Sequence, residues 1–420
     1  MASSVRRIAI DIGPLRASRD YRLLWFGELV SETGHQITVV AIFVQVFRIT
    51  GSAAAVGLVG LVQLFPLLVA SIGGGSITDA VDRRKVLLFT QFGYTVASAL
   101  LLAGALAGSP PLWLVYGAAG LTAGLSGINF PTRSAMTPRL VGAEHLPTAL
   151  ALNQVLFTST LIVGPAIGGV VIAHLDLPWA YGIDLVTYGA MIVAASLMRP
   201  MPPVVGERRP STGMRAIREG FAYLKGRKVL QSTFYVDIIA MVFGMPRALF
   251  VILAAVQFHR EPDRVAEVAG YLFSAVGVGA LLGALTAGWV GRVRHQGRAV
   301  VIAVCVWGAG ITAFGLVGAN LWLAIVFLAI AGAADVISAV FRNTILQLSV
   351  PESLRGRLSG MHILVVTGGP RIGDFEAGVV AQAFTPTISV VSGGLLCILG
   401  AVGLALAVPS FWRYQAGGET

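Results

Sequence analysis

The sequence is poor in charge. Only 12% of its 420 residues are charged, against roughly 25% in a typical soluble domain. Apolar residues make up 56%, and the mean hydropathy is +0.80. These values exclude an ordinary soluble enzyme and a disordered chain. The net charge of +10 is spread too thinly for a nucleic-acid-binding surface. We therefore expect an all-α membrane protein.

Cysteine and metal-binding patterns are also scarce. Cys305 and Cys397 lie in apolar stretches, which argues against a disulfide framework and indicates two small buried side chains. The six histidines lack the spacing of metal ligands. No phosphate-binding Gly-x-x-x-x-Gly-Lys-[Ser/Thr] motif occurs, so ATP is not expected as the direct energy source. We expect no cofactor, no metal and no enzymatic activity.

What the sequence has instead is long apolar runs. A bilayer core of about 30 Å requires about 20 apolar residues of helix. Twelve runs meet this length, at about 22–47, 54–77, 86–107, 112–133, 147–173, 179–198, 230–257, 266–290, 299–318, 321–342, 358–381 and 387–410. No apolar run precedes Tyr21, so the first span is expected to be an uncleaved anchor.

Basic residues alternate along the connections. The two termini and the connections that follow even-numbered spans hold 25 of the 30 lysines and arginines, and the opposite connections hold 3. Because lysine and arginine gather on the cytoplasmic side of membrane proteins, both termini are predicted to be cytoplasmic.

The two halves of the chain resemble each other. Gly-Pro-Ala-Ile-Gly at 164–168 recurs as Gly-Pro-Arg-Ile-Gly at 369–373, and Leu-x-x-x-Glu-x-Leu begins at both Leu140 and Leu348. A duplication of six spans is typical of transporters whose halves rock about a central site. We predict an N-terminal six-helix half at 1–198, a cytoplasmic linker with an amphipathic helix at 199–229, and a C-terminal six-helix half at 230–420.

Three motifs resemble those of the major facilitator superfamily. They are Gly-Ser-Ile-Thr-Asp at 75–79 followed by Arg-Arg-Lys at 83–85, Gly164-Pro165 with Gly168-Gly169, and Val-Pro-Glu-Ser-Leu-Arg-Gly-Arg at 350–357. The last resembles the subgroup that includes the enterobactin exporter and related drug effluxers. The resemblance implies the twelve-helix major facilitator fold and export of a small amphiphilic molecule, a siderophore or a drug, from the cytoplasm. It also implies proton antiport by a monomer in a bacterial inner membrane, with lipid around it.

The first motif predicts a gate and the second a hinge. Asp79 lies at the cytoplasmic end of span two, where a carboxylate suits a helix N-terminus or an arginine such as Arg133. The predicted gate residues are Asp79, Arg83 and Arg133; a charge that only fixes the topology is the alternative. The predicted hinge residues are Gly164, Pro165, Gly168, Gly369 and Pro370, because glycine allows close helix packing and proline favours a kink.

Ionisable residues inside the spans indicate proton or substrate sites. Glu28, Glu32 and His35 share one face of span one. Two carboxylates that close repel each other, so one could hold a proton near neutral pH. A polar stripe bonded to neighbouring helices is the alternative. The predicted proton-coupling residues are Glu28, Glu32, His35 and Asp374.

Span eleven carries a second charged pair. Arg371 and Asp374 lie three residues apart on one face. We expect them to form a switchable ion pair or to provide an anion contact for the substrate. A permanent ion pair that holds a bend in the helix is the alternative. The predicted substrate-binding residues are Gln36, Asn153, Gln154, Asp237, Asp335 and Arg371. A nutrient importer of the same fold, a membrane enzyme, and a lipid flippase without proton coupling remain the alternatives to an exporter.

Overall fold

The computed structural model describes residues 11–108, 110–203, 214–258 and 262–415, and every regular element in these ranges is helical. The first part contains α2 (Gly13–Ala17), α3 (Arg19–Thr50), α4 (Ala53–Ala80), α5 (Arg83–Leu106), α6 (Leu112–Leu175) and α7 (Leu177–Leu197). The second contains α8 (Met214–Leu224), α9 (Lys228–Phe243), α10 (Leu249–Leu253), η1 (Ala254–Phe258), α11 (Pro262–Thr286), η2 (Ala287–Arg292), α12 (Gln296–Leu316), α13 (Leu321–Ser349), α14 (Glu352–Ala383), α15 (Pro386–Ala407) and α16 (Pro409–Trp412).

These helices contain the twelve predicted spans. Nine helices of the described ranges are long and apolar enough to cross a membrane. The 64-residue α6 holds the fourth and fifth spans, separated only at Gly142, whose φ of 72° leaves the helical region. The segments α9, α10 and η1 follow one another through the seventh predicted span, and α14 holds the eleventh. The predicted all-α membrane architecture is therefore confirmed.

Local sequence fixes where the first helices begin and end. The Ser18 side chain accepts a hydrogen bond from Tyr21 N and starts α3, and the Ser52 side chain does the same for α4. Between them Gly51 has φ 61°, a left-handed conformation that ends α3. Two long spans thus connect through a very short turn.

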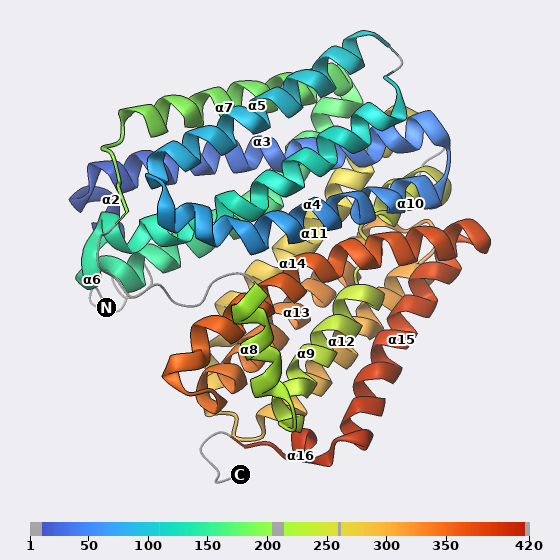
Figure 1. The fold of residues 1–420 in the computed structure, drawn as a ribbon. Helices are drawn as coiled ribbons and strands as arrows, with labels where there is room; N and C mark the ends of the chain where they lie inside the picture. The colour runs from blue at the N-terminus through green and yellow to red at the C-terminus, as the bar shows by residue number, and fades with distance from the viewer. Residues whose placement is uncertain (1–10, 109, 204–213, 259–261, 416–420) are drawn as a thin grey trace, which may run out of the picture.

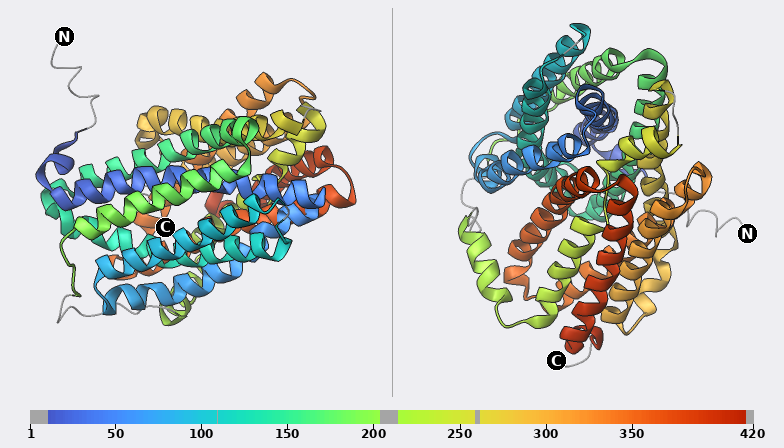
Figure 2. Two further views of the ribbon diagram at one scale, coloured as in Figure 1. Left: turned by 90° about the horizontal axis from the view of Figure 1, so that it is seen from above. Right: turned by 90° about the vertical axis from the view of Figure 1, so that its right-hand side faces the viewer.

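The helices form two bundles, α3–α7 and α9–α15, whose colours run from blue to green and from yellow-green to red (Figure 1). The bundles lie together where α4, α10 and α14 meet, and they diverge toward the ends that bear α2 and α16. The right-hand view in Figure 2 shows the same two groups of helices. The amphipathic helix α8 belongs to the second group and packs on α9 and α14, where Leu224 lies in one apolar cluster with Phe234 and Met361.

Glycines bring the bundles into contact at two places. A Cβ on Gly57 of α4 would lie 3.0 Å from Gly378 Cα of α14, and one on Gly169 of α6 would lie 3.0 Å from Gly270 Cα of α11. No larger residue fits at either place without displacing backbone. The second span of each half therefore crosses the fifth span of the other half, as expected for a duplicated chain.

Candidate functional site

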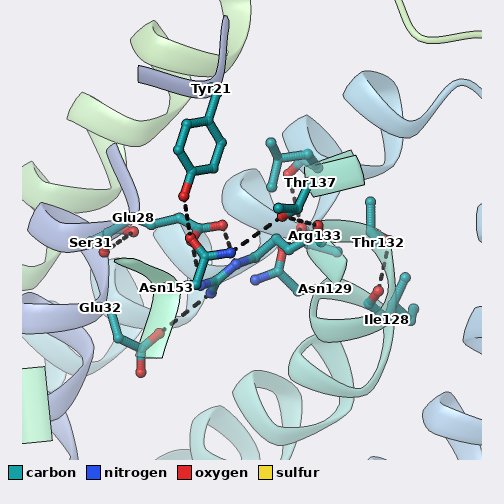
Figure 3. A network of polar contacts seen from close by, with 12 residues as sticks. Tyr21, Glu28, Ser31, Glu32, Ile128, Asn129, Thr132, Arg133, Thr137 and Asn153 are labelled. Carbon is teal, nitrogen blue, oxygen red and sulfur yellow. Dashed lines mark hydrogen bonds and ion pairs between the residues drawn. The ribbon is translucent and has the colours of Figure 1, made fainter. Parts of the chain in front are cut away.

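Two glutamates of α3 share one arginine of α6 (Figure 3). Arg133 Nη2 donates to Glu28 Oε2 at 2.5 Å, and its Nε contacts the other oxygen of Glu28. Arg133 Nη1 lies 3.8 Å from Glu32 Oε2. The Glu28 side chain is 6% exposed, while Glu32 and Arg133 are 22% and 24% exposed. We call these three residues the N-half cluster. With both carboxylates ionised it carries one net negative charge, and a single proton makes it neutral.

Polar side chains surround the N-half cluster. Gln36 Nε2 donates to Glu32 Oε1 at 3.1 Å. On the other side Tyr21 OH donates to Asn153 Oδ1 at 2.9 Å, and Asn153 Nδ2 donates to Thr137 Oγ1 at 3.3 Å (Figure 3). The predicted substrate residues Gln36 and Asn153 thus stand beside the carboxylates, in a layer that joins α3 to both parts of α6.

Two predicted residues lie apart from this layer. His35 Nδ1 is 3.0 Å from Tyr188 OH, and the Tyr188 ring stacks on Tyr94 with centroids 5.2 Å apart. His35 therefore contacts α7, and the predicted group of Glu28, Glu32 and His35 is divided. Gln154 is exposed, and its amide donates to Thr158 of the same helix at 3.4 Å.

The second bundle contains a comparable group of charges. Arg342 Nε of α13 lies 2.9 Å from Asp237 Oδ1 of α9, and His362 Nε2 of α14 lies 2.8 Å from Asp237 Oδ2. Arg342 Nη2 lies 3.6 Å from Asp335 Oδ1. We call Asp237, Asp335, Arg342 and His362 the C-half cluster. Its side chains are 0%, 24%, 1% and 13% exposed in that order.

The burial of Asp237 changes its expected role. Both carboxylate oxygens are occupied, by Arg342 and His362, so a substrate has no access to them in this conformation. Asp335 is the more accessible carboxylate of the cluster. In the described residues no group of three or more histidine, cysteine, aspartate or glutamate side chains has the arrangement of a metal site.

The expected pair of Arg371 with Asp374 does not form. Asp374 Oδ2 accepts from Arg247 Nη2 at 2.7 Å, and its Oδ1 accepts from Ala248 N at 3.0 Å. Arg371 Nη1 instead donates to the carbonyl of Thr367, one turn earlier in α14. Helical spacing correctly placed Arg371 and Asp374 near each other, but the α9–α10 junction supplies a better-positioned cation.

The gate residues are only partly described. The side chain of Asp79 lies outside the described residues. Arg83 Nη1 donates to Ala135 O at 3.0 Å and so links α5 to α6. Arg133, considered as a partner for Asp79, contacts Glu28 and Glu32. We therefore assign Arg133 to the N-half cluster.

The hinge motifs pack tightly against the first helix of their own half. A Cβ on Gly164 would lie 2.4 Å from Gln36 Cβ, and one on Gly369 would lie 2.7 Å from Met241 Cβ. Both the glycines and their contact residues are 205 positions apart. A proline follows each glycine inside its helix. The packing is compatible with a hinge, which stays a prediction.

Arg342, His362 and the pairing of Arg133 with Glu28 and Glu32 were not predicted from the sequence. The halves did contain a signal. Glu28 and Asp237 are 209 positions apart, as are Arg133 and Arg342, close to the offsets of the two repeated motifs. The recurrence of an acidic residue and an arginine at one common offset marked these positions in both halves.

Comparison with known proteins now settles the family. The family model described as transmembrane secretion effector matches residues 10–415. The chain belongs to this family. It is 26% identical over 410 residues to the enterobactin exporter EntS of Shigella boydii serotype 18, covering 97% of this chain and 96% of the relative. The identity is also 26%, over 409 residues, to EntS of Escherichia coli O1:K1 / APEC, with the same coverage.

Solved structures confirm the fold of this secretion-effector family member. The nucleoside transporter NupG superposes with a TM-score of 0.73 at 11% identity, covering 94% of this chain and all of that one. The POT family transporter PepTSo superposes with a TM-score of 0.71 at 13% identity, covering 94% and 98%. The predicted major facilitator fold is thus confirmed. The protein is a multi-pass membrane transporter and not an enzyme.

Proposed function

We propose that this transporter exports a small amphiphilic molecule from the cytoplasm in exchange for protons, with the N-half cluster as a proton site. The observation that carries the proposal is the sharing of Arg133 by Glu28 and Glu32. An unneutralised charge inside a membrane is costly, so the cluster favours binding one proton. Glu32 is the natural acceptor, because its contact with Arg133 is long and it is the more exposed carboxylate.

Alternating access is supported by the way the bundles meet. Gly57 and Ser52 lie near the start of α4, while Gly378 and Gln382 lie near the end of α14. Ser52 Oγ donates to Gln382 Oε1 at 2.9 Å, beside the glycine contact. In the predicted orientation, with both termini cytoplasmic, this end faces outward. The structure then corresponds to a state closed to the outside, with the bundles diverging toward the cytoplasm.

In this scheme the proton and the substrate compete. A proton on the N-half cluster neutralises it and allows the empty transporter to return to the cytoplasm-facing state. Substrate arriving in the polar layer of Gln36 and Asn153 then displaces the proton to the cytoplasm. The direction of export is supported by the description of the family and by the relatives, and the siderophore class is supported by the enterobactin exporters among those relatives. A bacterial inner membrane is the proposed location.

Purified protein in liposomes containing a pH-sensitive dye tests the proposal. Siderophores, cationic dyes and antibiotics are added one at a time, and proton movement is recorded for wild type and Glu32→Gln. We expect substrate-dependent proton movement in wild type and a marked reduction of it in Glu32→Gln. Glu376→Gln, which removes a carboxylate of α14 outside both clusters, is the matched control and should behave as wild type.

Two results would overturn the proposal. Substrate movement without proton movement would indicate facilitated transport, or lipid flipping if lipids were the molecules moved. Proton movement in the same direction as the substrate would indicate an importer of the same fold.

A further inference from the structure

The two charge clusters are built on the same plan. In each half, the first long helix supplies a carboxylate and the fourth span supplies an arginine: Glu28 with Arg133 and Asp237 with Arg342. Both members of the pair are displaced by 209 positions between the halves. A second carboxylate then approaches each arginine, Glu32 at 3.8 Å and Asp335 at 3.6 Å.

The second carboxylates come from different helices. Glu32 lies on α3, with the first acid of its cluster, whereas Asp335 lies on α13, with the arginine. The charge balance is nevertheless the same. With neutral His362, the C-half cluster has two carboxylates and one guanidinium, and therefore one net negative charge. It lies deeper than the N-half cluster, since Asp237 and Arg342 are 0% and 1% exposed.

We propose that the C-half cluster is a second proton-binding site, in which His362 and Asp335 share one proton. Arg342 stays charged, because arginine is not deprotonated in proteins. The two carboxylate oxygens of Asp237 contact Arg342 and His362. His362 and Asp335 are the partly exposed members of the cluster. One proton on either of them makes the cluster neutral. The inference deepens the proposed function, because it adds a proton site to the transporter.

The groups around His362 are consistent with this role. From α9 it faces Asp237 and the edge of the Phe234 ring, with centroids 6.0 Å apart. From α13 the cluster contributes Arg342 and Asp335. On the side of α8, Glu219 is paired with Arg357 at 2.9 Å. On α15, the thiol of Cys397 is buried and donates to Val304 O of α12 at 3.9 Å.

A proton at this site would act on α14. When His362 is protonated, its hydrogen bond to the Asp237 carboxylate becomes an ion pair, because both the donor and the acceptor are then charged. Protonation therefore strengthens the attachment of α14 to α9. The same α14 meets the other bundle at Gly378. The site thus couples proton binding to a helix that must move when the bundles rock.

Nuclear magnetic resonance of the full-length protein in lipid nanodiscs tests the proposal without any substrate. The histidines carry ¹⁵N and the aspartates carry ¹³C in the carboxyl group, and spectra are recorded over the range in which histidine titrates, roughly pH 5 to 8. His362→Gln and Asp335→Asn, which conserve side-chain size, identify the two signals. We expect the proton to be bound, as imidazolium at His362 or as a neutral carboxyl at Asp335.

The variants sharpen the test. Asp335→Asn removes one negative charge, so the imidazolium fraction of His362 at a given pH should fall several-fold. Glu32→Gln, in the other cluster, should leave it unchanged. The proposal is overturned if His362 stays neutral and Asp335 stays ionised over the whole range. Because no transport is measured, this result is independent of whether antiport occurs, and absence of proton flux in liposomes would not alter it.

Discussion

Arg133 and Arg342 each pair with a carboxylate that lies 105 positions earlier in the chain, on the first long helix of its own half. The two pairs therefore bridge equivalent helices in the two bundles. The carboxylate differs, glutamate in one half and aspartate in the other, while the arginine is the same. Arginine suits this position because its guanidinium is always charged and can contact two carboxylates at once.

Breaking the buried pair of the second bundle should destabilise the protein. Arg342→Met leaves Asp237 with His362 as its remaining partner, and loss of one member of a buried pair costs about 3–5 kcal/mol. The double variant Asp237→Asn/Arg342→Met removes both charges and should recover most of this loss. Unfolding in detergent, followed by tryptophan fluorescence, measures both. A single variant as stable as wild type would show that water reaches the pair.

Substitutions at the glycine contacts should open the end that is closed here. A Cβ on Gly57 would lie 2.5 Å from Asp374 O, so Gly57→Val should separate α4 from α14. Oxidative cross-linking of Ser52→Cys with Gln382→Cys, whose side chains are hydrogen-bonded in the native protein, should fall several-fold.

The same helix provides the control for that experiment. A Cβ on Gly73 of α4 would meet no heavy atom of the described residues within 4 Å, apart from its own helix backbone and chain neighbours. Gly73→Val should therefore leave cross-linking unchanged. Equal cross-linking in Gly57→Val and wild type would contradict the role of the contact. Cys305 and Cys397, which are free, are replaced by alanine in all variants.

A surface pair should make stability depend on pH at the acidic end. Asp176, between α6 and α7, pairs with Arg48 at the end of α3. Burial acts to raise the pKa of Asp176, but hydrogen bonds from the Arg48 side chain and Leu177 N outweigh it and lower the pKa below the usual 3.8. Stability from this pair is present above that usual value and is lost as pH falls through the lowered pKa.

Asp176→Asn tests this pH dependence. Asparagine tolerates the φ of 73° at this position. Because the Asp176 side chain is 63% exposed, the variant should lose less than about 1 kcal/mol at neutral pH. The difference in melting temperature from wild type should vanish in acid. A difference that persists at the lowest pH would mean that the charge of Asp176 is not its cause.

Arg371 should discriminate between substrates by charge. Its described side-chain hydrogen bond is to Thr367 O, and it lies near the neutral pair of Arg247 with Asp374. A hydrogen bond to a charged group is worth about 1.5–3 kcal/mol, so Arg371→Gln should weaken binding of an anionic substrate by about 10- to 100-fold. Binding of a neutral substrate should change little. Arg298→Gln, at an exposed position, controls for loss of surface charge.

If both clusters exchange protons during transport, the number of protons moved per substrate should depend on both. The variant Asp335→Asn/His362→Gln should retain substrate-dependent proton movement but with about half as many protons per substrate. Simultaneous recording of labelled substrate and internal pH in liposomes gives the ratio. An unchanged ratio would mean that the second site binds its proton permanently through the cycle.

The fold could be predicted from the sequence because each span carries its own signal. Apolar length gives the helices, and the repeated motifs at Gly164 and Gly369 relate the halves. Even the irregular joint at Gly142 falls in a connection between predicted spans. These properties depend on neighbouring residues in the chain, so no knowledge of packing is required.

The ion pairs were harder to predict from the sequence than the helices, because which residues of two helices meet depends on how those helices cross. Spacing along α14 put Arg371 and Asp374 on one face, but could not show that Arg247 approaches Asp374 more directly. The same limit separated His35 from Glu28 and Glu32, since residues on one face of α3 contact different neighbouring helices.

The short connection between the two helical parts of α6 has a mechanical consequence. One residue in a non-helical conformation, Gly142, separates the span that bears Arg133 from the span that bears Gly169. Because this connection is so short, the two spans have little freedom to move independently. A displacement of Gly169 against Gly270 would therefore also move Arg133. The glycine contact between the bundles and the charged residues of the N-half cluster would then shift together.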